Sequence, residues 1–215
     1  PFAEIADNGG RDDDALDARF EACTGCPAQP FRALGAFNRI GLDARPGDVM
    51  NPVKQLLYEA PLMPLFEADF AELEPEAHYR VLAARYARYA EENPAFADFF
   101  GFYAQLGRAV AAKCAYRAAA APAVRRGDRR AVEKDVLPLC DACIEEMRAL
   151  WMNSLRPFGF EVIDIRLSAQ IGRLETARER IGAFAQGRLD DIPELTEEKL
   201  PYLKRADGTL ANLNI

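Results

Sequence analysis

The stretch that decides the fold is residues 94–121, PAFADFFGFYAQLGRAVAAKCAYRAAAA. It is rich in alanine, which has the highest intrinsic helix propensity of the amino acids. Its larger apolar residues recur every three or four positions, as on one face of a helix. They are Phe96, Phe99, Phe100, Tyr103, Leu106, Val110 and Cys114. This spacing predicts a long helix whose broad apolar face needs other helices to cover it.

Helical spacing and helix-capping residues extend over most of the remaining chain. Capping residues predict helix starts at Asp12–Asp14, at Asn51 with Pro52, at Pro75 and at Asp128. Glycines predict helix ends at Gly25 and Gly187. A shorter apolar segment has its large residues at a spacing of three, and these are Phe31, Leu34, Phe37 and Ile40.

Two segments need a choice between structures. Residues 129–154 have a helical pattern that contains Pro138, so we expect a kinked helix there. FEVIDIRL, residues 160–167, has the β-branched residues of a strand, but its continuation to RLETARERIGAF, residues 173–184, favours a helix. The sequence therefore predicts an all-α fold, a bundle of about six to eight helices of which several are long and antiparallel.

Composition excludes several classes of protein. The chain has 215 residues, half of them hydrophobic, and a net charge of −7, which disfavours a nucleic-acid binder because such proteins need a basic face. No apolar run approaches the roughly 20 residues of a membrane-spanning helix. Five cysteines is an odd number, which favours a reducing compartment and hence the cytoplasm, while a signal peptide upstream of Pro1 stays open.

Two cysteine pairs raise the question of a zinc site. CTGC contains Cys23 and Cys26, and CDAC contains Cys140 and Cys143. Two such pairs can supply a tetrahedral site with four thiolates. The pairs are far apart in the sequence, however, and CDAC falls within a helical pattern, where free cysteines usually serve as small core residues. We therefore expect no metal and no cofactor, and keep structural zinc as the alternative.

Residues that typically carry catalysis are scarce. His78 is the only histidine, and it lies in a charged helical segment that favours a surface or interhelical role. The motifs GxGxxG and GxSxG and the P-loop do not occur in the sequence. No catalytic residue is predicted.

The stretch LWMNSLRPFGFEVIDIRLSAQIGRLETA, residues 150–177, combines the sole tryptophan with a helix break flanked by aromatic residues. Such a corner suits docking on another surface, although its aromatic rings can equally fill the core of their own bundle. We also expect Asp164 to pair with Arg156 or Arg166. The candidate interface residues are Trp151, Arg156, Phe158, Phe160, Glu161, Asp164 and Arg166.

RPFGFEVIDIRL and QIGRLETARERI resemble the signature near the end of bacterial exo-β-N-acetylhexosaminidases of glycoside hydrolase family 20, in the subgroup with an α-helical C-terminal domain. DALDARFEACTG, residues 14–25, and NPVKQLLYEAPLMPLF, residues 51–66, resemble earlier segments of that subgroup. The resemblance runs from about Asp12 to about Leu195. The chain departs from the family with SAQ at residues 168–170, where relatives often have two glycines, and with Leu155 and Arg156 before PFGF.

The resemblance implies a domain organisation and a role. Residues 1–11 would be the end of the last barrel helix and a linker, residues 12–187 the helical C-terminal domain, and residues 188–215 an irregular tail. The catalytic Asp-Glu pair of the family lies in a (β/α)₈ barrel, and its motif is absent here. The chain would thus be a non-catalytic domain that packs on its own upstream barrel.

Three further expectations accompany this role. The domain would support a homodimer, and the full enzyme would act on glycans that end in N-acetylhexosamine. The corner from Phe158 to Phe160 would contribute a wall to the glycan site. The alternative to all of them is a free-standing helical binding or regulatory module whose two cysteine pairs hold zinc.

Overall fold

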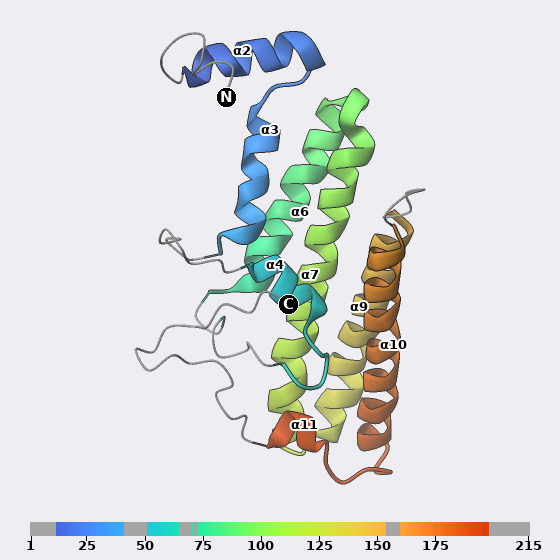
Figure 1. Ribbon diagram of the computed structural model, residues 1–215. Helices are drawn as coiled ribbons and strands as arrows, with labels where there is room; N and C mark the ends of the chain where they lie inside the picture. Colours follow the sequence, from blue (N-terminus) through green and yellow to red (C-terminus); the bar gives the residue numbers. More distant parts are fainter. Residues whose placement is uncertain (1–11, 41–50, 65–69, 71–72, 154–159, 198–215) are drawn as a thin grey trace, which may run out of the picture.

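The computed structural model describes residues 12–40, 51–64, 70, 73–153 and 160–197, and it confirms the all-α prediction (Figure 1). These residues contain no strand. In chain order the elements are α2 (Asp13–Thr24), α3 (Gln29–Arg32), η1 (Ala33–Asn38), α4 (Pro52–Tyr58), α6 (Pro75–Glu92), η2 (Pro94–Phe96), α7 (Ala97–Arg125), α8 (Arg129–Ala131), η3 (Val132–Val136), α9 (Leu137–Asn153), α10 (Phe160–Ala185) and α11 (Pro193–Thr196).

Helix α7 is the central element of the bundle. It has 29 residues and contacts α6, α9, α4 and α11. Figure 1 shows α6 beside one end of α7, and α9 with α10 along the other end. The main partner of helix α10 is α9, and the side chain of Gln170 on α10 also contacts Lys113 on α7. No helix of the described chain is long and apolar enough to cross a membrane.

The predicted helix caps are confirmed. The side chains of Asp12, Asn51 and Asp128 each accept a hydrogen bond from a backbone N–H in the first turn of the helix that follows. Gly25 and Gly187 adopt the left-handed conformation after α2 and α10, with φ of 68° and 74°. FEVIDIRL is helical, as its continuation predicted.

The segment with apolar residues at a spacing of three forms α3 and the 3₁₀ helix η1. A 3₁₀ helix has three residues per turn, so residues three apart lie on one side of it. That side faces the bundle, where Phe37 is buried, and Ile40, which follows the end of η1, is buried too. The hydroxyl of Tyr79 donates to the carbonyl of Phe37 over 2.9 Å, which fixes η1 against α6.

The predicted kink at Pro138 corresponds to a π-helical turn, η3, that ends at Val136 just before the proline. Proline lacks the N–H that would bond the carbonyl four residues earlier, here that of Lys134. A π turn widens the helix by one residue and accommodates such an interruption. The helix from Arg129 to Asn153 is otherwise continuous.

Phe31 joins the N-terminal helices to the bundle. Its ring centroid lies 5.1 Å from that of Phe20 on α2, and 5.2, 5.4 and 5.1 Å from those of Phe96, Phe99 and Phe100. Helix α2 itself buries no residue. The next residue, Arg32, also attaches α2, because it forms ion pairs with two acidic residues of that helix.

Helices α6 and α7 approach each other closely at Gly107. A Cβ atom added there would lie 3.0 Å from both Cβ and the backbone nitrogen of Ala83, whereas one added at Gly101 on the same helix would meet nothing within 4 Å. We expect Gly107→Ala to lower the free energy of unfolding by about 1–3 kcal/mol through overpacking. Gly101→Ala should raise it by about 0.5–1 kcal/mol, because alanine loses less backbone entropy in a helix. Urea unfolding followed by circular dichroism measures both, and effects of the same sign would contradict the close approach.

Candidate functional site

The structure joins two of the predicted interface residues at the corner between α9 and α10. The indole N–H of Trp151, at the end of α9, donates to Oδ1 of Asp164 on α10 over 2.7 Å. No ion pair joins Asp164 to Arg166, whereas Arg156, the other predicted partner, lies outside the described residues. The side chains of Asp164 and Arg166 point in different directions because residues two apart on a helix do not face each other. The guanidinium of Arg166 lies over the ring of Tyr58 instead, 5.7 Å from its centroid.

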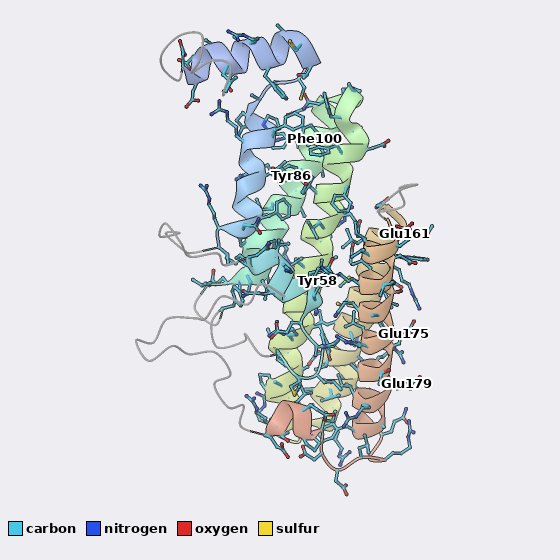
Figure 2. The ribbon with its side chains drawn as sticks, viewed as in Figure 1. Tyr58, Tyr86, Phe100, Glu161, Glu175 and Glu179 are labelled. Atoms are coloured by element: carbon cyan, nitrogen blue, oxygen red, sulfur yellow. The ribbon has the colours of Figure 1, made fainter. Side chains whose placement is uncertain are left out.

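The other predicted interface residues are only partly described. Glu161 is exposed in the first turn of α10 (Figure 2). Arg156, Phe158 and the side chain of Phe160 lie outside the described residues.

An apolar surface on α10 was not predicted. Val162, Ile165 and Ala169 are exposed and follow helical spacing along one side of the helix, and we call them the α10 apolar face. Val162 is 58% exposed and Ile165 is 67% exposed. Leu167 and Leu174 belong to another side of the same helix and are buried in the core. Helix α10 therefore has apolar residues both toward the bundle and toward solvent.

A buried polar cluster between α4, α7 and α10 was also missed from sequence. Lys113 on α7 has no exposed surface. Its ammonium donates to the backbone carbonyls of Leu57 and Glu59, over 2.7 and 2.5 Å, and to Oε1 of Gln170 over 3.1 Å. The amide nitrogen of Gln170 donates to the carbonyl of Tyr58 over 2.8 Å. Lys113 and Gln170 thus bind three successive carbonyls at the C-terminal end of α4, where a helix favours positive charge.

An ion pair completes the cluster. Nη1 of Arg117, one turn along α7 from Lys113, lies 2.5 Å from Oε2 of Glu59, and both side chains are buried. Figure 2 shows the neighbouring Tyr58 where α4 crosses α7. Two cations against one carboxylate leave one positive charge, which the carbonyls of α4 partly offset. Burial lowers the pKa of Lys113 to about 7.

The four cysteines of the alternative zinc site are not grouped together in the structure. Cys26 is buried near α3, and its thiol donates to Oδ1 of Asn93 over 3.1 Å. Cys140 and Cys143 are buried on α9, and the thiol of Cys140 faces the carbonyl of Leu174 on α10. Cys23 is exposed on α2. The two pairs therefore belong to different helices with different neighbours.

Metal-binding chemistry has no support elsewhere in the described chain. Among those residues, no three His, Cys, Asp or Glu side chains are grouped so that they could hold a metal ion. Burial raises the pKa of Cys140 and Cys143 to about 12, so these thiols stay protonated at neutral pH. The interhelical role predicted for His78 agrees with its contacts, since Nε2 lies 3.0 Å from the carbonyl of Ala36 on η1.

The sequence was compared with models of known protein families. The family model described as Glycoside Hydrolase 20C C-terminal domain matches residues 29–214. The chain belongs to this family. No curated protein matches the sequence.

The family match confirms the resemblance seen in RPFGFEVIDIRL. In this 20C C-terminal domain, the matched residues include the buried polar cluster and the α10 apolar face, whereas α2 precedes them. Both features therefore lie within the residues that match the family model.

Proposed function

We propose that this chain is a non-catalytic helical domain of an exo-β-N-acetylhexosaminidase, the enzyme that removes terminal β-linked N-acetylhexosamine from glycans. In this proposal the domain packs on the catalytic barrel of the same enzyme through the α10 apolar face and the adjoining corner at Trp151. The membership of the chain in the 20C C-terminal domain family supports it, because such a domain accompanies a catalytic domain. The observation that carries it is the exposure of Val162 and Ile165.

Exposed apolar side chains on a core helix favour a protein partner. Burying them in an interface removes apolar surface from water, which stabilises the complex by about 25 cal/mol for each Å² buried. The Trp151–Asp164 hydrogen bond holds the start of α10 in place, so the face is presented on a fixed element. A patch of a few side chains is smaller than the roughly 1,200–2,000 Å² that a stable dimer buries. A linked domain needs less area, because the linker raises its effective concentration.

Aspartate substitutions on the face test the docking. In the full-length enzyme, changing both Val162 and Ile165 to Asp should lower the melting temperature by about 2–4 °C for each kcal/mol of docking energy lost. In the chain alone, the same changes should alter the free energy of unfolding by no more than about 0.5 kcal/mol. Val81→Asp on α6 is the matched control, because Val81 is also 58% exposed. Equal effects of the α6 and α10 changes in the enzyme would contradict docking through α10.

Two measurements distinguish the remaining possibilities. A chromogenic N-acetyl-β-glucosaminide should be hydrolysed by the full-length enzyme and not by this chain, and turnover by the chain would overturn the non-catalytic role. A dimer of the chain in sedimentation, lost when Val162 and Ile165 become Asp, would assign the face to a second copy. In the same activity assay, a raised KM after Phe158→Ala and Arg156→Ala would indicate a glycan wall, whereas unchanged kinetics would leave packing alone.

A further inference from the structure

Gln170 is the link between Lys113 and the end of α4. Its Oε1 accepts from the ammonium of Lys113, and its Nε2 donates to the carbonyl of Tyr58. The amide can make both bonds in one orientation only, because Oε1 only accepts and Nε2 only donates. The three N–H donors of a charged lysine match the three oxygens that surround it. The observed arrangement is therefore that of protonated Lys113.

Loss of one proton removes this match. A neutral amine has two N–H donors and one lone pair, so one of its three oxygen neighbours would face the lone pair. The carbonyls of Leu57 and Glu59 are backbone groups and cannot become donors. Gln170 can become a donor to Lys113 if its amide turns so that Nε2 faces the amine. Turning the amide directs Oε1 at the carbonyl of Tyr58 and breaks that hydrogen bond.

We propose that Lys113 and Gln170 form a protonation-linked switch, in which charged Lys113 ties α10 to the end of α4 and neutral Lys113 releases the tie at Tyr58. The tie involves the part of α10 that carries the α10 apolar face, since Gln170 follows Ala169 directly. Any effect of the switch on docking rests on the proposed function, but the switch itself does not.

Among the described residues, the charged and titratable groups around Lys113 come from α7, α9, α10 and the segment after α4. From the segment after α4, Glu59 forms an ion pair with Arg117 of α7. Cys114 of α7 and Cys143 of α9 have pKa values raised to about 12 by burial. On α10, Gln170 does not titrate and Arg166 is occupied with the ring of Tyr58. Burial lowers the pKa of Lys113 itself to about 7.

Nuclear magnetic resonance of the ¹⁵N-labelled chain tests the switch directly. The side-chain amide of Gln170 is assigned as the signal lost in Gln170→Leu. Between about pH 6 and about pH 8.5 its resonances should shift with the same midpoint as the Lys113 side chain. Its nuclear Overhauser contacts to Tyr58 should disappear over that range. The amide protons of Gln170 should gain contacts to Lys113 instead.

Two variants decide the cause of the shift. Lys113→Met keeps the volume and removes the titrating group, so the Gln170 signals should no longer move with pH. Lys134→Met, an exposed lysine on η3, should leave the titration unchanged. A Gln170 amide that does not move, or that still moves in Lys113→Met, would overturn the switch. If Lys113→Met does not fold, unequal midpoints for Lys113 and Gln170 in the unsubstituted chain would overturn it.

Discussion

Replacing Glu59 with glutamine should lower the free energy of unfolding by about 3–5 kcal/mol, the cost of leaving a buried charge without its partner. Glu59 is the only acidic side chain that the structure shows paired with Arg117, and Lys113 lies one turn away with its ammonium on the Glu59 carbonyl. Glutamine keeps the shape but removes the negative charge. The buried guanidinium of Arg117 would then lose the carboxylate that the structure places beside it.

An exposed ion pair provides the control for this change. Glu76 on α6 pairs with Arg80 over 2.8 Å, with its side chain 40% exposed. Pairs of this kind contribute about 0–1 kcal/mol, so Glu76→Gln should cost correspondingly little. Both values come from urea unfolding at one pH near neutrality. Similar losses in the two variants would mean that the Glu59 charge is not needed to balance the cluster.

The second large effect is a rise in stability with pH between about 7 and 9. The ordinary pKa of lysine is 10.5, and burial lowers that of folded Lys113 to about 7. Within this window the unfolded chain binds a proton on Lys113 that the folded chain has released. The free energy of unfolding therefore increases with pH, by at most about 1.4 kcal/mol per unit. The cost of burying the charge is fully present below pH 7 and is relieved as pH rises.

Cysteines set the upper limit of this window. The pKa values of Cys114, Cys140 and Cys143 are raised from 9.0 to about 12 in the folded chain, so above pH 9 the unfolded state releases protons first and stability falls. Thermal or urea unfolding in steps of half a pH unit gives the slope. In Lys113→Met the rise should vanish, whereas Lys134→Met should retain it. A rise that persists without Lys113 would show that another group causes it.

Local signals in the sequence were sufficient for the helices. Caps such as Asp12 and Asn51 act within three residues, and the alanine-rich pattern of α7 is contained in one segment. Even the strand-like FEVIDIRL was assigned correctly from its continuation. The sequence did not show that the helix is interrupted before Pro138 by a π turn, because a kink and a π turn give the same sequence pattern.

The polar cluster depends on contacts that sequence spacing does not encode. Lys113 meets Glu59 and Gln170 from more than 50 positions away on either side. One signal was available, since Lys113 and Arg117 stand one turn apart in a segment otherwise made of small and apolar residues. A helix buried all round that contains two cations needs an acidic partner. Which carboxylate supplies it follows only from the path of α4 across α7.

The corner at α9 and α10 was predicted in part. Trp151 and Asp164 were singled out and do lie together, but as a hydrogen-bonded pair. Val162 and Ile165 were not singled out, because a helical apolar pattern does not say which side the rest of the bundle covers. Which side of α10 is covered depends on the position of α9, its main partner.

Helix α2 has a mechanical consequence. It contributes no buried side chain, and it contacts the adjacent residues Phe31 and Arg32. Phe31 and Arg32 therefore couple any movement of α2 to the bundle. A force that tilts α2 is delivered through the ring of Phe31 to Phe99 and Phe100 at the start of α7, the longest element of the domain.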